Sequence, residues 1–464
     1  MFESLSRKTF SNVDQTQFAK FSGDHNPIHV DPIAARRTLV GQCVVHGMHG
    51  LLWALESLII NRNVFVNKVK VDFLKPIFLN EEIDCEWDEV KSQIRLSAGG
   101  LPLVKIKVRL GLATALSYRS ELAESGHTTC VERNFSDCLA ITSVPVRGCT
   151  NLALASMMFP ICSRYYGDAT VCDIGSASYI VGMECPGLHS FFVSFEAEFK
   201  QQSGPSYFSV VDADARFCLI RIAMQGQAIQ ASIEAFQRPA PTVSPTMSAV
   251  VQRVNAGSFE GVRALIIGGS RGIGEVIAKM VCAGGGDSVI TYNVGRTEAE
   301  SVVTEIGQWG GSCEAAQLNI LRPDDVDIDF SSFNQIYFFA TPKIAPQRDE
   351  RFNLKKIAEY RSVFVDAFKL LCNQVINQSV CLKIFYPSTI FIDDRVVGFE
   401  DYVLSKIEGE KVCDEINALD LGVRIIYSRL PRLNTDQNQS VATAVSSENV
   451  VDVMLPIMKR MANP

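Results

Sequence analysis

A glycine-rich turn between an apolar strand pattern and a helix pattern is the feature that most constrains the fold. The strand pattern covers Val262 to Ile267, the helix pattern covers Glu275 to Cys282, and the turn between them reads Gly268-Gly269-Ser270-Arg271-Gly272-Ile273-Gly274. Such a turn lets backbone amides approach a pyrophosphate at the start of the helix. Strand patterns alternate with helix patterns after it, which is typical of a parallel sheet. Residues 259–464 are therefore predicted to form an α/β, Rossmann-type, doubly wound parallel sheet.

The first half of the chain has a different pattern, in which one apolar helix is followed by several strands. Residues 47–60 are mostly apolar and predict a helix that is buried on nearly all sides. Four stretches with strand patterns follow it: Val64 to Leu74, Glu82 to Val90, Ile94 to Ala98 and Leu103 to Leu112. A buried helix wrapped by antiparallel strands is the hot-dog arrangement.

The composition narrows the function classes. A net charge of −7 argues against nucleic-acid binding, which needs a basic face. No apolar run approaches the roughly 18 residues of a membrane span, and the first residues lack a signal pattern. The 14 cysteines lack C-x-x-C spacing and the six histidines lack zinc-finger spacing. We therefore expect a cytoplasmic protein with reduced cysteines and no metal.

A short loop ahead of the apolar helix, residues 22–31, carries a carboxylate and an imidazole five residues apart. Gly23 and Pro27 bracket Asp24, which predicts a tight turn. Asp24 and His29 can then converge on one water, as general acid–base catalysis requires. For an isolated pair, the alternative is a loop whose acid caps a turn and whose histidine is incidental.

The loop reads Ser-Gly-Asp-His-Asn-Pro-Ile-His-Val-Asp and resembles the signature S-G-D-x-N-P-[ILV]-H-x-D of the MaoC-like (R)-specific enoyl thioester hydratases. It matches every fixed position. The resemblance implies a hot-dog fold for residues 1–120. It also implies catalytic roles for Asp24 and His29, with Asn26 orienting the pair.

In the resembling hydratases, the start of the helix after a His-Gly pair helps to hold the thioester carbonyl. Gly47 is therefore our oxyanion-hole candidate, because free N–H groups at a helix start favour developing negative charge. The alternative is a glycine that simply lets the helix and a strand approach. His46 is expected to be structural.

Residues 121–238 lack an acid–base motif but repeat the order of the first part. A helix is expected over residues 151–166, kinked by Pro160. Four strands are expected after it: Gly187 to Phe199, Ser206 to Asp212, Phe217 to Met224 and Ala228 to Phe236. We interpret this segment as a degenerate second repeat, which makes the N-terminal half an α+β double hot-dog. Residues 239–258 contain three prolines and predict a semi-extended linker.

The glycine-rich turn has the spacing G-x-x-x-G-I-G of the short-chain dehydrogenases/reductases, and residues 289–306 resemble the bacterial 3-ketoacyl-ACP reductases. The resemblance implies a nicotinamide cofactor. NAD enzymes usually place an acid after the second strand, where this chain has Tyr292 and Asn293. Arg271 and Arg296 stand nearby and can pair with a 2′-phosphate, which favours NADPH over NADH.

Tyr402 and Lys406 form a Tyr-x-x-x-Lys motif, which places both side chains on one helix face. The lysine would hold the ribose and assist the tyrosine, which donates or accepts the alcohol proton. Ser388, at a predicted strand end, is expected to hydrogen-bond the substrate ketone. The full set of expected cofactor contacts is Gly268, Ser270, Arg271, Gly272, Ile273, Gly274, Asn293, Arg296, Asn319, Ala340, Tyr402, Lys406 and Thr435.

Several reductase motifs are altered. The Asn-Asn-Ala-Gly segment of the family appears as Phe338-Phe339-Ala340-Thr341, so only Ala340 matches. Asn319 replaces the aspartate near the adenine, and Arg432 replaces a glycine of the segment over the nicotinamide. The usual seventh strand is also missing. These departures suggest a slow reductase, an unusual substrate or a cofactor-binding relic.

We therefore expect a bifunctional enzyme that acts on acyl thioesters of CoA or acyl carrier protein. The reductase part would make an (R)-3-hydroxyacyl thioester, and the hydratase part would dehydrate it to a trans-2-enoyl thioester, or the sequence would run in reverse. One alternative is a monofunctional hydratase with a degenerate nucleotide-binding module. Another is a scaffold that binds acyl carriers in a biosynthetic assembly line. The sequence leaves the chain length, the direction and the oligomeric state open.

Overall fold

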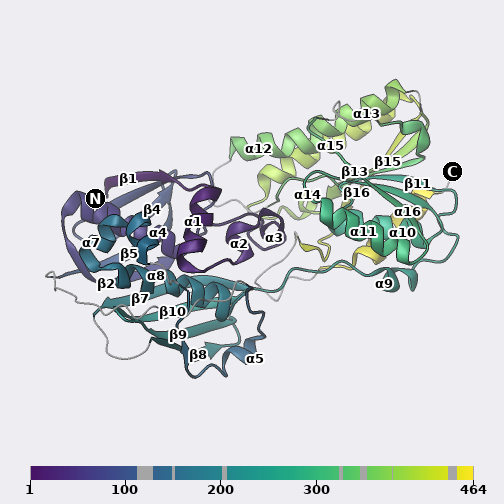
Figure 1. Ribbon diagram of the computed structural model, residues 1–464. Coiled ribbons are helices and arrows are strands. Elements are labelled where there is room, and N and C mark those ends of the chain that lie inside the picture. Colours follow the sequence, from purple (N-terminus) through teal and green to yellow (C-terminus); the bar gives the residue numbers. More distant parts are fainter. Residues whose placement is uncertain are drawn as a thin grey trace. The chain divides into compact units, whose positions relative to one another are not determined.

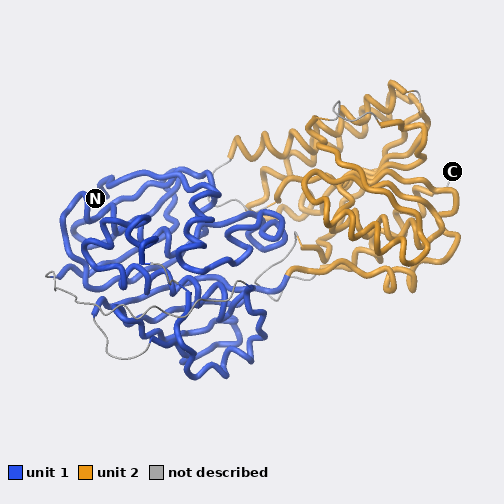
Figure 2. The backbone as a smooth tube through the Cα atoms, viewed as in Figure 1, with its two compact units in different colours: residues 1–240 blue, residues 241–464 orange. Residues whose placement is uncertain are grey.

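The computed structural model describes residues 2–111, 129–148, 152–200, 206–322, 328–344, 353–378, 380–436 and 447–462. The chain forms two compact units, Met1–Ala240 and Pro241–Pro464 (Figure 2). The boundary expected between residues 120 and 121 lies outside the described residues. None of the described helices combines the length and the apolar character that crossing a bilayer requires.

Unit 1 is built on one ten-stranded antiparallel sheet whose two halves have the same strand order (Figure 1). The order is β1-β3-β4-β5-β2-β7-β10-β9-β8-β6, so β2 and β7 pair at the centre and each half runs outward from them. The strands of the first half are β1 (Glu3–Thr9), β2 (Phe65–Phe73), β3 (Glu82–Asp88), β4 (Gln93–Ala98) and β5 (Leu101–Gly111). Those of the second half are β6 (Val144–Pro145), β7 (Ser190–Phe199), β8 (Tyr207–Asp214), β9 (Leu219–Gln225) and β10 (Ile229–Gln237). The sequence predicted all of these except the outermost strands, β1 and β6.

The first half of unit 1 packs its sheet on α4 (Gly47–Arg62), the apolar helix that the sequence predicted. Most of its side chains are buried, and it ends at Asn63 in a left-handed conformation with φ of 50°. A buried helix against an antiparallel sheet is the expected hot-dog arrangement. Unit 1 also contains α1 (Asn12–Ser22), α2 (Pro27–Val30), α3 (Pro32–Ala35) and α5 (Phe135–Cys138).

The central helix of the second half is not the one that the sequence predicted. Asn151 lies outside the described residues, and the rest of the expected helix forms two short ones, α6 (Leu152–Met158) and α7 (Pro160–Tyr166). Pro160 starts α7, where its missing N–H costs nothing. The buried helix is α8 (Asp168–Tyr179), which continues as the π-helical η1 (Ile180–Glu184). The serine and aspartate residues of α8 interrupt the apolar pattern by which a buried helix is recognised in a sequence.

The expected linker, residues 239–258, is only partly extended. Its residues 247–251 form a helix, α9 (Met247–Val251), because Met247 and Val250 are apolar and are buried in the core of unit 2. The buried Lys279 reinforces this attachment, since its Nζ donates to the Pro245 carbonyl at 3.0 Å and pairs with Glu305 at 2.7 Å.

Unit 2 contains a six-stranded parallel sheet in the order β13-β12-β11-β14-β15-β16, which is the 3-2-1-4-5-6 order of a Rossmann fold. Its strands are β11 (Arg263–Ile267), β12 (Asp287–Tyr292), β13 (Ser312–Gln317), β14 (Gln335–Phe338), β15 (Leu382–Thr389) and β16 (Val423–Leu430). Alternate residues of β11, such as Ile266 and Leu265, belong to two separate hydrophobic clusters. The sheet is therefore covered on both faces.

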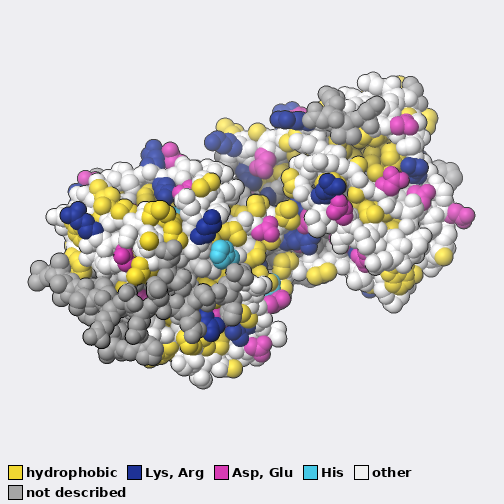
Figure 3. Space-filling model, viewed as in Figure 1, with side chains coloured by type: hydrophobic (Ala, Val, Ile, Leu, Met, Phe, Trp, Pro, Cys, Tyr) yellow, Lys and Arg dark blue, Asp and Glu magenta, His cyan; other side chains and the backbone are white. Residues whose placement is uncertain are grey.

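Helices of unit 2 belong to one or the other of these two clusters. α10 (Gly272–Ala283), α11 (Arg296–Gln308) and α16 (Val450–Ala462) share one cluster with α9. The other contains α12 (Leu354–Arg361), the π-helical η4 (Ser362–Ala367), α13 (Phe368–Asn377), α15 (Glu400–Leu419) and the short η3 (Phe330–Ser332). α14 (Phe391–Asp394) follows β15. On the face drawn in Figure 3, acidic and basic side chains are interspersed on both units.

Candidate active sites

Asp24 lies in a buried loop that the end of α1 positions. The helix ends at Gly23, whose φ of 78° is left-handed and turns the chain inward. The Ser22 hydroxyl donates to the Phe18 carbonyl at 2.8 Å and accepts the Asp24 N–H at 3.1 Å. Only 1% of the Asp24 surface is exposed. The tight turn predicted from the glycine therefore places the acid inside unit 1.

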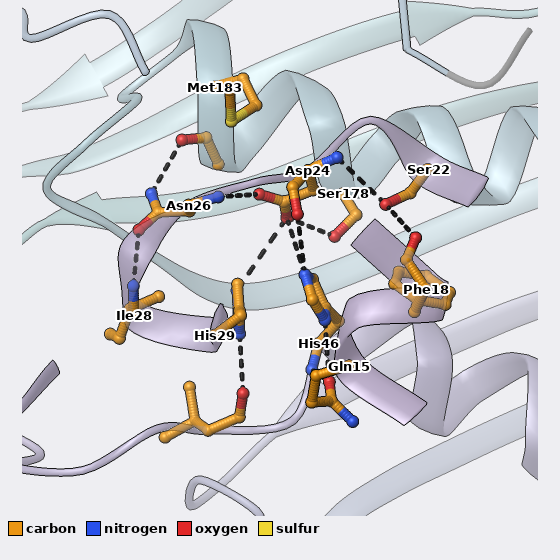
Figure 4. A network of polar contacts seen from close by, with 12 residues as sticks. Gln15, Phe18, Ser22, Asp24, Asn26, Ile28, His29, His46, Ser178 and Met183 are labelled. Carbon is orange, nitrogen blue, oxygen red and sulfur yellow. Dashed lines mark hydrogen bonds and ion pairs between the residues drawn. The ribbon is translucent and has the colours of Figure 1, made fainter. Parts of the chain in front are cut away.

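The Asp24 carboxylate accepts hydrogen bonds from both halves of unit 1 (Figure 4). Its Oδ1 accepts the Asn26 N–H at 3.1 Å, and its Oδ2 accepts the Ser178 hydroxyl of α8 at 2.7 Å. Burial raises the pKa of Asp24, while the charge of His29 and these hydrogen bonds oppose the rise. Asp24 therefore keeps a proton to higher pH than an exposed aspartate, which suits a group that both takes and gives protons.

His29 faces this carboxylate from α2. Its Nδ1 lies 2.8 Å from the Val44 carbonyl, which can only accept, so the proton of the neutral ring is on Nδ1. The free Nε2 lies 3.9 Å from Asp24 Oδ2, too far for a direct hydrogen bond and suited to one bridging water. Burial lowers the pKa of His29, which favours the neutral imidazole. The structure thus brings together the two groups that the sequence paired.

His46 packs beside His29 (Figure 4). Their rings stack with centroids 3.8 Å apart. His46 is fully buried, its Nδ1 and backbone N–H contact Gln15 Oε1 at 2.8 and 3.0 Å, and its Nε2 lies 3.0 Å from the Asp24 carbonyl. Burial lowers its pKa well below the ordinary value. These contacts fit the structural role that we expected.

Asn26 ties the loop to the second half of unit 1. Its Nδ2 donates to the carbonyls of Gly182 at 2.8 Å and Gly187 at 3.2 Å. Its Oδ1 accepts the Ile28 N–H at 3.1 Å and so caps α2. The side chain holds the segment between Asp24 and His29 in place through these bonds.

Two further residues complete the site, and sequence reasoning missed both. Ser178 bonds to the Asp24 carboxylate, and Gly182 packs so closely on it that a Cβ there would lie 2.2 Å from Asp24 Oδ1. Gly182 lies in the π-helical η1, a type of segment that is common at functional sites. No motif connects these positions to residues 22–31, because only the packing of one half on the other brings them together.

Asp24, His29 and His46 also have donor atoms within 4.8 Å of one another, which is metal-like spacing. However, His46 Nε2 is already bonded to the Asp24 carbonyl. The cluster then offers two free ligand atoms, fewer than the three protein ligands of a catalytic zinc site. The arrangement is better suited to proton transfer than to metal binding.

Gly47 begins α4, directly after His46. Its N–H has no acceptor within the helix, as the oxyanion-hole prediction requires. The alternative also has structural support, because a Cβ on Gly47 would lie 2.8 Å from the Phe73 ring of β2. The oxyanion role of Gly47 therefore remains a prediction.

Replacing Ser178 with alanine should move the acidic limb of the hydration rate to higher pH. The hydroxyl stabilises the ionised form of Asp24, so its removal raises the pKa of Asp24 further and leaves less carboxylate at a given pH. The profile of kcat/KM against pH with crotonyl-CoA measures this effect. Ser176→Ala, on the same helix, is the matched control. An identical acidic limb in both variants would contradict the assignment.

The glycine-rich turn of unit 2 connects β11 to α10, as predicted. A Cβ on Gly274 would lie 2.3 Å from the Gly268 carbonyl, so this residue has to be glycine. Gly268 itself lies against the backbone of Ala340, with φ of 83°. α10 begins at Gly272, so its first N–H groups lack intrahelical acceptors. Ser270 and Ile273 are partly exposed beside them. This geometry fits a dinucleotide phosphate.

Other predicted cofactor residues follow the carboxyl ends of neighbouring strands. Asn293 follows β12, Asn319 lies just after β13, and Thr435 lies beyond β16. Carboxyl ends of parallel strands meet at one edge of the sheet, where such folds bind their cofactors. Arg296 starts α11 and its exposed Nε pairs with Glu300 at 2.8 Å.

Arg271 forms an ion pair within the protein, which the sequence did not indicate. Its Nη1 lies 2.5 Å from Oδ2 of Asp436, an acid with 6% exposure. The same carboxylate borders the first residue of α10, because a Cβ on Gly272 would lie 3.9 Å from Asp436 Oδ1. The predicted pairing of Arg271 with a 2′-phosphate therefore has an internal competitor.

Asp436→Asn should tighten NADPH binding by about tenfold. The substitution removes a negative charge beside the predicted phosphate site and releases Arg271 to pair with the cofactor. Fluorescence titration of the full chain with NADPH measures the dissociation constant. The control is Asp452→Asn, which removes an exposed ion pair with Arg253. Equal or weaker binding by the Asp436 variant would contradict this prediction.

Tyr402 and Lys406 lie on α15, one turn apart, as the sequence predicted. Burial raises the pKa of Tyr402, and a hydrogen bond with Thr389 opposes the rise. Lys406 Nζ donates to the Pro387 carbonyl at 2.6 Å and lies 3.9 Å above the centre of the Phe364 ring. Burial lowers the pKa of Lys406 to about 7. The lysine therefore contacts the strand end beside the tyrosine.

The expectation for Ser388 requires a correction. Its hydroxyl donates to Glu410 at 2.5 Å, and Glu410 is in turn paired with Arg429 at 2.7 Å. Successive residues of a strand point to opposite faces, so the next residue, Thr389, is the one beside Tyr402. Both residues carry hydroxyls, and no sequence pattern distinguishes them.

Comparison with known proteins gives two kinds of similarity. Residues 3–98 match the family model described as "MaoC like domain". A curated "3-oxoacyl-[acyl-carrier-protein] reductase" from Synechocystis sp. is 42% identical over 64 residues, which is 14% of this chain and 26% of that protein. The chain thus spans about a quarter of the length of this curated relative. The predicted resemblances to the MaoC-like and 3-ketoacyl-ACP reductase families are therefore confirmed.

Solved structures were also found. A short-chain dehydrogenase from Burkholderia cenocepacia in complex with NADP is 22% identical and covers 45% of this chain and 92% of its own, with a TM-score of 0.39. A putative short-chain dehydrogenase from Escherichia coli complexed with NADPH is 13% identical and covers 45% and 93%, with a TM-score of 0.40.

Proposed function

We propose that the chain is a bifunctional acyl-thioester enzyme. Unit 1 would interconvert (R)-3-hydroxyacyl and trans-2-enoyl thioesters, and unit 2 would reduce 3-ketoacyl thioesters with NADPH. The observation that carries the first activity is the pair of Asp24 Oδ2 and His29 Nε2, which face each other across 3.9 Å at a nearly buried site. The MaoC-like match over the same residues supports it.

In the dehydration direction, Asp24 and His29 would together remove the C2 proton and protonate the departing 3-hydroxyl. A buried carboxylate and a neutral imidazole can divide these proton transfers between them. Ser178 and Asn26 would hold the carboxylate and the loop in the reactive arrangement. The free N–H of Gly47 would stabilise the enolate-like oxygen.

In unit 2, Tyr402 would protonate the alkoxide formed from the ketone. Thr389, rather than Ser388, would position the ketone oxygen, because it is the hydroxyl beside the tyrosine. Lys406 would contact the ribose as well as the strand end. NADPH supplies the hydride when it is bound, and the turn from Gly268 to Gly274 would hold its phosphates.

The two reactions share the (R)-3-hydroxyacyl thioester, so one unit would supply the substrate of the other unit. The curated relative, which is named for an acyl-carrier-protein substrate, supports an acyl thioester of acyl carrier protein or CoA. The test uses the full chain. Loss of conjugated enoyl absorbance reports hydration of crotonyl-CoA, and NADPH oxidation reports reduction of acetoacetyl-CoA.

A second candidate is a monofunctional hydratase with a degenerate nucleotide-binding unit. One observation favours it: Asp436 forms an ion pair with Arg271 beside the predicted phosphate site. This candidate predicts hydration of crotonyl-CoA without NADPH turnover on any ketoacyl thioester.

A further inference from the structure

The end of β10 leads into a buried arginine that the proposed mechanism does not use. Arg238 has only 4% of its surface exposed. Its Nη2 donates to the Leu188 carbonyl at 2.8 Å, but Nε and Nη1 have no hydrogen-bond partner. Among the described residues, no carboxylate forms an ion pair with it. A buried guanidinium with two unpaired donors is costly unless something else binds there.

Arg238 lies beside the acid–base pair. The Leu188 carbonyl that accepts from Arg238 also lies 3.4 Å from Asn26 Nδ2, so one carbonyl joins the arginine to the catalytic loop. Burial is the main cause that lowers the pKa of His29, and the positive charge of Arg238 lowers it further. The guanidinium therefore lies near the acid–base pair, with two donor atoms still unpaired.

We propose that Arg238 binds a negatively charged oxygen of the acyl thioester substrate. Such an oxygen has two sources: the thioester oxygen, which gains charge in the transition state, and a carboxylate on the acyl chain. Either would supply the acceptor that the guanidinium lacks, and hydrogen bonds between charged groups are the strong ones. This inference rests on the proposed hydratase function and adds a substrate-binding residue to it.

The test compares two enoyl thioesters in the full-length chain. Crotonyl-CoA has an uncharged chain, and glutaconyl-CoA carries a carboxylate on the same skeleton. We expect Arg238→Gln to lower kcat/KM by about 10- to 100-fold, the effect of losing a hydrogen bond to a charged group. An equal fall in kcat on both substrates identifies the thioester oxygen. A rise in KM for glutaconyl-CoA alone identifies the chain carboxylate.

Controls separate this role from a structural one. Arg221→Gln removes an arginine of the same half that is exposed and paired with Glu234 at 2.9 Å, and it should leave both activities unchanged. Arg238→Ala should recover activity when methylguanidine is added, which a purely structural defect would not. If the glutamine variant does not fold, Arg238→Lys keeps the charge but not the fork of donors, and should show the same pattern more weakly.

Wild-type kinetics in a folded Arg238→Gln variant would overturn this inference and leave the proposed function standing. Failure of the wild-type chain to hydrate either thioester would overturn the proposed function, and the inference with it.

Discussion

Asp24→Asn should reduce hydration of crotonyl-CoA by about 10²- to 10⁴-fold, the usual contribution of general acid–base catalysis. The amide has the size of the carboxylate, and its oxygen can still accept the Asn26 N–H. The Ser178 hydroxyl can rotate to accept from the new NH₂ group, since a hydroxyl both donates and accepts. The hydrogen bonds with Asn26 and Ser178 would be kept, while the carboxylate that takes the proton would be lost.

The measurement is the initial rate of loss of enoyl absorbance, with thermal unfolding to confirm the fold. Asp31→Asn is a matched control, because Asp31 lies in the same loop and caps α3 through Oδ1, a role that asparagine also fills. It should hydrate at nearly the wild-type rate. Full activity of the Asp24 variant would remove this residue from the mechanism and leave His29 without its proposed partner.

The sequence predicted the part of this site that lies on one continuous segment. Asp24, Asn26 and His29 are within six residues, so local turn chemistry was enough to place them together. Ser178 and Gly182 are more than 150 positions away, and they reach Asp24 only because β2 pairs with β7 and brings the second half against the first. A contact of this kind has no local signal.

The fold shows the same limit. The alternating strands were predicted because period-two burial is visible in the sequence. The buried helix α8 was missed because its interior contains Asp173, Ser176 and Ser178. Asp173 is compatible with burial because its Oδ2 accepts the Ala228 N–H at 2.6 Å, and Ala228 lies in the distant turn between β9 and β10. Polar residues whose partners are distant in sequence make a buried helix look exposed.

In unit 2, the glycine turn and the Tyr402–Lys406 pair were predicted because each depends on local spacing. The choice between Ser388 and Thr389 depended instead on which face of β15 each side chain takes. The ion pair of Arg271 with Asp436 joins residues far apart in sequence. The sequence therefore indicated a cofactor-binding turn, but it did not indicate that Asp436 competes with the cofactor for Arg271.

Tyr402→Phe should lower the rate of NADPH-dependent reduction of acetoacetyl-CoA by about 10²- to 10⁴-fold. The rate of hydration of crotonyl-CoA should stay unchanged. The phenol is buried and its pKa is raised, so it is protonated across the neutral range and can protonate an alkoxide. The hydroxyl is its only donor group, and phenylalanine preserves the ring contacts with Tyr360 and Phe364. The lower rate would therefore reflect the missing proton donor and not a change in packing.

Hydration measured on the same preparation is the internal control for this experiment, because its residues belong to unit 1. Tyr337→Phe is the matched variant, since it removes a buried hydroxyl on β14 of the same unit, which bonds to Gln335 at 2.7 Å. It should keep reduction intact. Equal reduction by the Tyr402 variant and the wild type would exclude Tyr402 as the proton donor. If the wild type hydrates crotonyl-CoA but does not reduce acetoacetyl-CoA, the ion pair of Arg271 with Asp436 is the first explanation to test. In that case, Asp436→Asn should restore NADPH binding even if turnover stays absent.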